Sequence, residues 1–488
     1  MNVNSSEETT QGSEPVDYSR KWYVMAAVGM GILLGTIDAS IVNVALPTLI
    51  REFNASFSTV QWVVLAYMLT LSTLTLTMGR WGDIIGKKQI YMAGMVVFTL
   101  GSMLCGISPS IYWLIGFRVF QAVGASMTAA LGAAVITEAF PPQQRGKAIG
   151  AAGAIVSFGI VSGPAIGGML IDFISWRWIF YVNVPIGIIG VILALRFVPN
   201  IKTAKGQRFD YGGASSVFIS QLALLLALTV GQRIGFGNPI IIGLFVLCLV
   251  FFILFLLVES TFHHPMVDLK LFKNHLLGIN LLNGFISFVS LGGIIILMPF
   301  YLENVLNYDP YQVGLLLAVL PVIGGIVSPI SGALSDRFGS GSITVLGLLI
   351  MVGGYIGLTT LDAQTTILGF ILTFIPIGLG MGIFQSPNNS AIMGAAPNHR
   401  LGLASSLLPV SRTLGNSSGI AAVGAFWASR MAFYAGPHMT KDLKQIPIPA
   451  QVTALKETLW GVALFTSVAL ILAVWGLFMK KKRAAKDV

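Results

Sequence analysis

Long apolar stretches of about 20 residues, separated by short polar ones, follow one another along almost the whole chain. A helix needs about 20 apolar residues to cross the hydrocarbon core of a bilayer, so each stretch predicts one transmembrane helix. The stretches cover residues 23–47, 60–78, 89–107, 111–132, 148–171, 177–197, 211–231, 238–258, 277–301, 313–331, 343–361, 366–390, 402–425 and 459–479. The pattern predicts an all-α integral membrane protein with 14 transmembrane helices.

Composition agrees with a membrane protein and excludes an ordinary soluble one. The chain is 55% hydrophobic and 10% charged, whereas soluble domains contain about 25% charged residues. The net charge of +10 does not indicate a nucleic-acid partner, because the basic residues lie between apolar stretches and not together on a soluble face.

The sequence offers no sign of an enzyme or of a bound cofactor. It contains no phosphate-binding GxxxxGK[ST] motif, and its five histidines form no cluster with ligand spacing. No nucleophile with a neighbouring base and no paired carboxylates stand out. We therefore expect no metal, no nucleotide and no catalytic residue.

Lysine and arginine are more frequent in alternate connections, and positively charged connections stay in the cytoplasm. With an even number of spans both termini lie on the same side, and the basic tail at residues 480–488 belongs to the positive set. We expect a multi-pass protein of the plasma membrane with a polar cytoplasmic tail at residues 1–22 and both termini in the cytoplasm.

A short motif occurs twice and divides the chain into related halves. Gly79, Asp83 and Gly86 follow the second stretch, and Gly332, Asp336 and Gly339 follow the tenth with the same spacing. The repeat predicts two six-helix bundles, at residues 23–200 and 277–479, with a linker and two inserted helices at residues 201–276. Parallel repeats of this kind are a transporter architecture.

Basic residues accompany both copies of the motif: Lys87 and Lys88 in the first and Arg337 in the second. An Asp in this position can cap a helix or pair across the interface between the halves, which would make the motif a conformational latch. The alternative is a plain turn between two helices.

Asp38 lies deep in the first stretch, roughly 13 Å from the outer boundary at 1.5 Å per residue. A carboxylate at this depth costs several kcal/mol unless it is paired, hydrated or protonated. We expect Asp38 to bind and release protons. The alternative is a structural aspartate that is satisfied by a neighbouring hydroxyl or backbone group.

Arg118 lies in the fourth stretch at a similar depth, about 10 Å from the outer boundary. Opposite charges at matched depth suggest partners that face one cavity, where Arg118 would sense proton binding to Asp38. A structural arginine bonded to carbonyl groups is the alternative. Arg412, in the second half, is a third intramembrane charge and is expected to face the central cavity.

The fifth stretch carries a cluster of small residues around a proline. Gly159, Gly163, Gly167 and Gly168 allow close approach of another helix, and Pro164 removes one backbone hydrogen bond and bends the helix. The cluster predicts a kinked, tightly packed helix. Small-residue packing alone, without a functional role, is the alternative.

Taken together these motifs resemble the major facilitator superfamily, and within it the drug:proton antiporter branch with fourteen spans, across nearly the whole chain. The resemblance implies a conformational role for the repeated loop motif and a proton-coupling role for the fourth helix. It also implies an exporter, which the fifth-helix motif marks in the family. The residues that carry it are Gly79, Asp83, Gly86, Lys87 and Lys88; Arg118, Gln121 and Gly124; Gly163, Pro164, Gly167 and Gly168; and Asp38, Asn43 and Pro47.

The first copy of the loop motif departs from the family pattern. The family usually has an arginine directly after the loop aspartate, and this chain has Ile84, although Arg337 keeps that position in the second copy. Trp81 replaces the usual leucine.

We expect a secondary antiporter that works by alternating access, exporting small amphipathic compounds in exchange for protons. Asn43, Gln121 and Arg412 are the candidate cavity residues. Its expected partners are the small-molecule substrate, protons and the lipid bilayer, and we expect it to act as a monomer. The alternative is a dedicated exporter or importer of one metabolite, such as a vitamin, siderophore, lipid or antibiotic.

Overall fold

The computed structural model describes residues 20–141, 144–199, 210–261, 269–395, 401–436 and 443–484, and the regular structure within these ranges is helical. Residues 1–19 of the predicted N-terminal tail and 485–488 of the predicted C-terminal tail lie outside the described residues, and the last helix extends to Ala484. The first seven helices are α1 (Lys21–Phe53), α2 (Phe57–Ile85), α3 (Lys87–Gly106), α4 (Ile111–Ala139), α5 (Arg145–Phe173), the single turn α6 (Trp178–Tyr181) and α7 (Asn183–Phe197).

A pair of helices follows in the described part of the chain, and after it a second set of six long helices. The pair is α8 (Tyr211–Ile234) and α9 (Pro239–Thr261). The second set is α10 (His275–Phe300), which continues into the π-helical turn η4 (Tyr301–Val305), then α11 (Pro310–Phe338), α12 (Ser340–Leu358), α13 (Ile367–Ala395), α14 (Leu401–Ala435) and α15 (Ile448–Ala484). Short 3₁₀ turns, η3 (Leu269–Lys273) and η7 (Leu443–Gln445), precede α10 and α15.

Within the described residues, 13 helical segments are long and apolar enough to cross a membrane, one fewer than the number of apolar stretches. The segment Trp178–Phe197, which contains α6 and α7, counts as one. The difference lies in α14, which covers the stretch 402–425 but is not among the 13. Arg412, Asn416 and the serines around them lower the hydropathy of the central part of α14.

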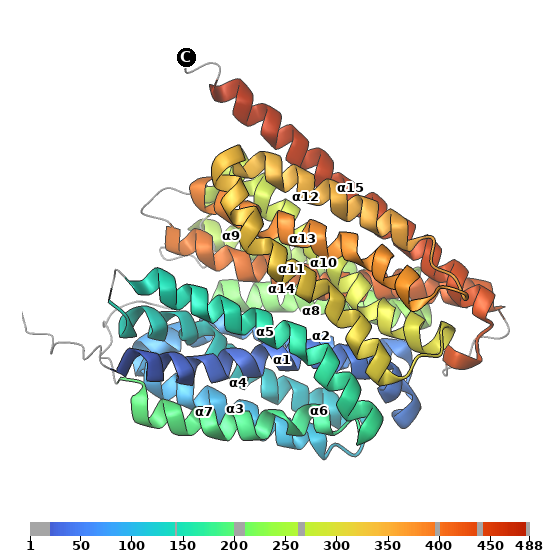
Figure 1. The fold of residues 1–488 in the computed structure, drawn as a ribbon, viewed down its shortest axis with the longest axis horizontal. Helices are drawn as coiled ribbons and strands as arrows, with labels where there is room; N and C mark the ends of the chain where they lie inside the picture. Colours follow the sequence, from blue (N-terminus) through green and yellow to red (C-terminus); the bar gives the residue numbers. More distant parts are fainter. Residues whose placement is uncertain are drawn as a thin grey trace, which may run out of the picture.

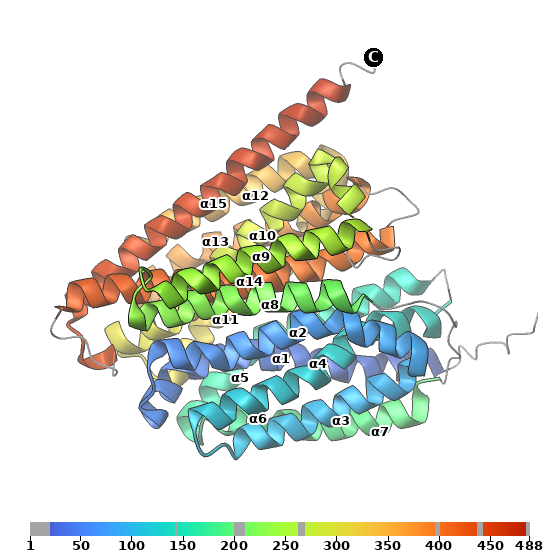
Figure 2. The same cartoon turned by 180° about the vertical axis from the view of Figure 1, so that it is seen from behind.

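The helices form two groups. Helices α1–α7 contact one another, and α10–α15 do the same; we call these the N-terminal group and the C-terminal group. The groups meet mainly where α5 packs on α11 and where α2 packs on α14. Helix α8 contacts α9, α2 and α14, so the pair α8–α9 lies across the seam between the groups, as Figure 2 shows.

The last glycine of each motif copy forms a sharp corner between two helices. Gly86 is the single residue between α2 and α3, and Gly339 is the single residue between α11 and α12. Their φ angles are 126° and 86°, a region that side chains with a Cβ rarely adopt. The spacing of the repeat therefore has a local physical cause: each copy ends one helix and starts the next without a loop.

The two groups touch at one end of the molecule. We call the end where α1 begins and α15 ends, toward the left of Figure 1, the termini side, and the opposite end the far side. On the far side a Cβ added to Gly168 of α5 would lie 2.3 Å from the carbonyl oxygen of Pro310, and one added to Gly314 of α11 would lie 2.2 Å from that of Pro164. The backbones of α5 and α11 are therefore in direct contact there.

Side chains reinforce this contact on the far side. Arg51, near the end of α1, donates to Glu303 of η4 at 2.8 Å, and the Glu303 side chain is buried. Gln61 of α2 donates from Nε2 to the carbonyl oxygen of Ile420 in α14 at 3.0 Å. Both bonds join the N-terminal group to the C-terminal group.

Toward the termini side the same helices are much more exposed. Ile149 of α5 is 56% exposed, and Ile326 and Ile330 of α11 are 63% and 55% exposed. Figure 1 shows the C-terminal group inclined away from the N-terminal group in this direction. The structure is closed on the far side and splayed on the termini side.

Candidate functional site

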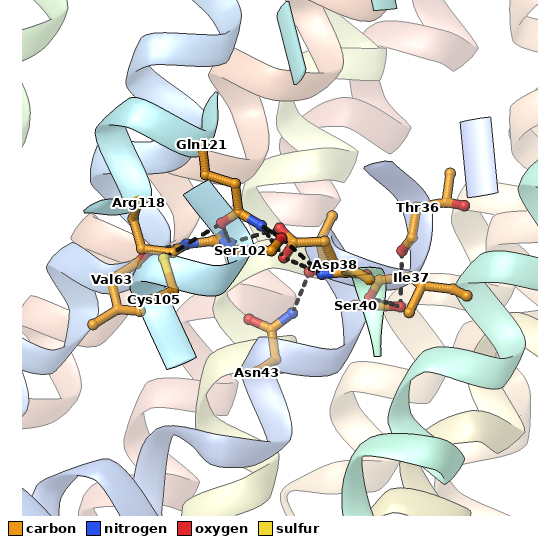
Figure 3. A network of polar contacts seen from close by, with 12 residues as sticks. Thr36, Ile37, Asp38, Ser40, Asn43, Val63, Ser102, Cys105, Arg118 and Gln121 are labelled. Carbon is orange, nitrogen blue, oxygen red and sulfur yellow. Dashed lines mark hydrogen bonds and ion pairs between the residues drawn. The ribbon is translucent and has the colours of Figure 1, made fainter. Parts of the chain in front are cut away.

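Asp38 lies near the middle of α1 and is buried inside the N-terminal group, with 0% of its surface exposed. Arg118 of α4 is 1% exposed, and its Nη1 donates to Asp38 Oδ2 at 2.6 Å. The matched depths inferred from the sequence thus correspond to a direct ion pair between α1 and α4. Figure 3 shows these two side chains and Gln121 converging on one point.

Gln121, one helical turn after Arg118, forms hydrogen bonds with both members of the ion pair. It accepts from Arg118 Nη1 on Oε1 at 2.7 Å, and its Nε2 donates to Asp38 Oδ1 at 2.8 Å and to Ser102 Oγ of α3 at 2.7 Å. Arg118 Nε donates to the carbonyl oxygen of Val63 in α2 at 3.0 Å. Four helices are therefore tied to one carboxylate.

Further contacts surround this network. Asn183, the first residue of α7, is buried and donates from Nδ2 to Asp38 Oδ1 at 3.2 Å. The guanidinium of Arg118 lies over the ring of Tyr67, with Cζ 4.1 Å from the ring centroid. Cys105 Sγ lies 3.7 Å from Gln121 Oε1. We call Asp38, Arg118, Gln121, Asn183 and Ser102 the carboxylate network.

The geometry fits an ionised carboxylate. Both oxygens of Asp38 accept hydrogen bonds, Oδ2 from Arg118 and Oδ1 from Gln121 and Asn183. A protonated carboxyl group would instead present one O–H donor. Proton binding would therefore break at least one of these contacts, and removing one partner of a buried ion pair costs about 3–5 kcal/mol.

The glycine cluster of α5 packs directly beside Asp38. A Cβ on Gly159 would lie 2.0 Å from Thr36 Oγ1, and one on Gly163 would lie 1.8 Å from Ser40 Oγ. Ser40 Oγ also lies 3.3 Å from the carbonyl oxygen of Gly159, to which it donates. Thr36 and Ser40 are two residues before and after Asp38, so α5 closes over the stretch of α1 that carries the carboxylate.

The same cluster reaches the other helix group. Gly167 faces Ile41 of α1, with a hypothetical Cβ 2.6 Å from Ile41 Cγ1, whereas Gly168 faces Pro310 of α11. Pro164 supplies the carbonyl oxygen that Gly314 approaches. One helix thus contacts both the carboxylate-bearing helix and the far-side seam.

Comparison with known proteins agrees with this architecture. Residues 28–420 match the Major Facilitator Superfamily. The chain belongs to this superfamily. The protein is therefore a secondary membrane transporter and not an enzyme.

Individual relatives of this superfamily transporter have different described roles. The riboflavin transporter RibZ of Clostridioides difficile is 34% identical over 464 residues, which cover 95% of this chain and 98% of RibZ. The multidrug transporter protein MdtP of Bacillus subtilis is 30% identical over 444 residues, which cover 91% of this chain and 82% of MdtP.

A solved structure supports the fold. A bacterial homologue of the human lysosomal transporter Spinster, in an inward-facing and unoccupied conformation, superposes with a TM-score of 0.64. The superposed residues cover 95% of this chain and 98% of the homologue's chain, with 18% sequence identity.

The loop motif of the transporter is only partly described. Lys87 forms an ion pair with Glu138 at the end of α4, and Lys88 Nζ donates to the carbonyl oxygen of Leu195 at 2.9 Å. Both contacts stay within the N-terminal group. The side chain of Asp83 lies outside the described residues. The latch role of the first copy therefore stays a prediction.

The remaining motif glycines and the second copy lie at the termini side. Gly79 of α2 faces Ala130 of α4, and Gly332 of α11 faces Ser386 of α13. Asp336 and Arg337 are exposed. The latch role of the second copy also stays a prediction.

The three candidate cavity residues have different surroundings. Gln121 belongs to the carboxylate network. Asn43 is buried and donates to the carbonyl oxygen of Ala39 one turn earlier, at 3.0 Å. Arg412 lines a small cavity between α10, α13 and α14, where its Cζ lies 5.6 Å from the ring centroid of Phe288. The role of Arg412 stays open.

Asn183, Ser102 and Tyr67 are site residues that the sequence did not predict. Asn183 follows an aromatic segment that is typical of a membrane interface, and Ser102 is an uncharged residue in an apolar stretch. A buried asparagine at the depth of Asp38 was the one available signal, because amides within spans tend to bond to other helices. Among the described residues no cluster of three or more His, Cys, Asp or Glu side chains could hold a metal ion.

Proposed function

We propose that this transporter exports small amphipathic compounds in exchange for protons, with Asp38 as the proton-binding group and Arg118 as its partner. The observation that carries the proposal is the ion pair between them, buried in the interior of the N-terminal group. A carboxylate is costly within a bilayer, and such residues mark ion and proton pathways in membrane proteins.

The network supplies a way to couple protonation to movement. With Asp38 ionised, Arg118 is held between the carboxylate of α1 and the carbonyl oxygen of Val63 in α2. A proton on Asp38 removes the charge that holds Arg118, so the guanidinium can reorient and α1 can move relative to α2 and α4. Helix α5 transmits that movement to the far-side seam through Gly168 and Gly314.

Orientation completes the proposal. With both termini in the cytoplasm of a plasma-membrane protein, all 14 stretches including α14 cross the bilayer, and the splayed termini side faces the cytoplasm. A substrate enters from inside as the proton leaves Asp38, and the ionised carboxylate then pairs with Arg118 as in this structure. After the far side opens, the substrate leaves outward and Asp38 takes up a proton from outside. The protein acts as a monomer in this scheme.

The test is transport in vesicles that contain the purified protein. A pH gradient should drive a transported cationic or neutral dye against its own gradient in the wild type. The Asp38→Asn variant should lose this gradient-driven transport, whereas Asp172→Asn, the same change at an exposed site on α5, should keep it. Gradient-driven transport by Asp38→Asn at the wild-type rate would overturn the role of Asp38.

A second candidate is a dedicated transporter of one metabolite. The observation in its favour is the near-complete coverage of RibZ, a riboflavin transporter. Growth of cells with and without the protein, measured against chemically unrelated toxic compounds and alongside riboflavin uptake and release, separates the two. Protection against several unrelated compounds supports broad export, and movement of riboflavin alone supports the second candidate.

A further inference from the structure

A second cavity lies away from the carboxylate network, beneath the two inserted helices. It has a volume of about 320 Å³ and lies between α2, α8, α9, η3, α10 and α14. Ligand sites in proteins have volumes of about 300–1,000 Å³, so the cavity can hold a small organic molecule. We call it the lateral pocket, because it lies at the side of the molecule where Figure 2 shows α8 and α9 over the seam.

The pocket has an aromatic lining. Phe252 and Phe255 come from α9, Phe272 comes from η3, and Phe285 comes from α10. Among the described residues that line it, none carries a charge. Phe252 and Phe272 are 47% and 41% exposed, so the pocket opens to the surface beside α9. These features favour an uncharged, flat aromatic ligand that stacks on the phenylalanine rings.

The side-chain amide of Gln221 gives the pocket lining a hydrogen-bonding group that a purely lipid-binding surface would lack. Gln221 of α8 is largely buried; its Oε1 accepts from Ser72 Oγ of α2 at 3.2 Å, and its Nε2 donates to Ser417 Oγ of α14 at 3.1 Å. An amide offers two donors and two acceptor positions, and these two bonds use one of each. A ligand carbonyl or amide could use the others.

We propose that the lateral pocket binds neutral aromatic molecules that carry a carbonyl or amide group, with the aromatic rings of α9 and α10 as walls and Gln221 as the polar contact. The proposal deepens the proposed function, on which it rests for the identity of the ligand as a substrate. It also gives the inserted helices a role: α8 and α9 complete a site between the two helix groups that α2 and α14 alone would leave open.

Gly278 provides a way to fill the pocket. It lines the pocket on α10, and a Cβ at this position would have its nearest neighbour, Phe272 Cδ1, at 3.8 Å, which is ordinary contact. Gly278→Ala and Gly278→Leu therefore place side-chain atoms inside the pocket and reduce its free volume without a backbone clash. Gly353→Leu is the matched control, because Gly353 is an exposed residue of α12 with nothing within 4 Å of its hypothetical Cβ.

The experiment is photolabelling of the full chain in lipid nanodiscs with benzophenone, a neutral aromatic ketone, followed by mapping of the labelled residues. We expect labels to concentrate on Phe252, Leu282 and Phe285. Labelling there should fall in the order wild type, Gly278→Ala, Gly278→Leu, by about tenfold for the last, which corresponds to 1.4 kcal/mol of binding free energy. Gly353→Leu should label like the wild type.

Labels spread evenly over the lipid-facing residues of α9, such as Ile240 and Leu249, would overturn the proposal. So would displacement of benzophenone by a fatty acid but not by an unlabelled aromatic ketone, because the pocket would then hold a lipid chain. The labelling needs no proton gradient, so the two proposals fail separately. If the wild type shows proton-driven transport but no labelling of the pocket residues, the pocket proposal alone is wrong. If the pocket residues are labelled but proton-driven transport is absent, the antiport proposal alone is wrong.

Discussion

Arg118 makes contacts that another cation cannot reproduce. Its Nη1 donates to both Asp38 and Gln121, its Nε donates to the carbonyl oxygen of Val63, and its plane lies over the ring of Tyr67. A guanidinium presents several donors in a fixed planar arrangement, whereas a lysine ammonium is a compact point charge. The positive charge alone is therefore not sufficient at this position.

Arg118→Lys should fold but lose most of the gradient-driven transport. Charged hydrogen bonds contribute about 1.5–3 kcal/mol each, so loss of one from the working network predicts a fall of about tenfold or more in the transport rate. The measurement is dye transport in vesicles at equal protein content. Arg196→Lys, at an exposed position on α7, is the control, and a wild-type rate for Arg118→Lys would show that the bond geometry is unimportant.

At the scale of the helix, α5 connects the helix that carries Asp38 to α11 of the C-terminal group. Gly159, Gly163 and Gly167 repeat every four residues, so they share the face that packs on α1. Gly168 lies on a different face, toward α11. In the proposed mechanism, α5 transmits movement of α11 at the far side to the part of α1 that holds Asp38.

Gly163→Ala should destabilise the protein because the added Cβ meets Ser40 Oγ at 1.8 Å and the carbonyl oxygen of Ile37 at 3.2 Å. Extra methyl groups in a tightly packed interior cost about 1–3 kcal/mol. Thermal unfolding of the purified protein should begin at a lower temperature than for Gly150→Ala, a change on the same helix at a position with nothing within 4 Å. Equal unfolding temperatures for the two variants would argue against close α1–α5 packing.

Parts of this arrangement could be anticipated from the sequence. Apolar stretches correspond to helices, and the spacing of Gly86 and Gly339 corresponds to corners that require a positive φ. Matched depth placed Asp38 and Arg118 at one level of the membrane. Depth does not say which helices are neighbours, however, so Asn183 and Ser102, which carry no charge, gave no comparable signal.

Contacts between the helix groups could not be anticipated. Arg51 and Glu303 both lie near the ends of apolar stretches, 252 positions apart in the chain. Their pairing depends on the conformation in which the far side is closed, and a sequence is common to all conformations of the cycle. The same holds for the contact between Gly168 and Pro310.

For the whole molecule, we expect the far-side seam to decide which conformation is populated. Gly314 fits against the carbonyl oxygen of Pro164, and the Arg51–Glu303 ion pair spans the same seam. Because backbone atoms meet here, neither helix can yield by a change of side-chain rotamer. A methyl group at this point should favour the state in which the seam is open.

Gly314→Ala should shift the population toward an open far side. Spin labels on Glu52 and Ala363, both exposed on the far side, should report a longer distance for the variant than for the wild type in a background that lacks Cys248. Gly339→Ala is unsuitable as a control because of its positive φ, so Gly353→Ala serves instead. An unchanged distance distribution for Gly314→Ala would contradict a seam closed by backbone contact.

Proton release on substrate binding tests the central claim most directly. Purified protein in weakly buffered detergent solution, mixed with a compound that the protein transports in vesicles, should release protons in the wild type, because substrate binding favours the ionised form of Asp38. Asp38→Asn should bind the compound and release none, whereas Asp172→Asn should release as many protons as the wild type. Proton release by Asp38→Asn equal to that of the wild type would contradict the assignment of Asp38 as the coupling group.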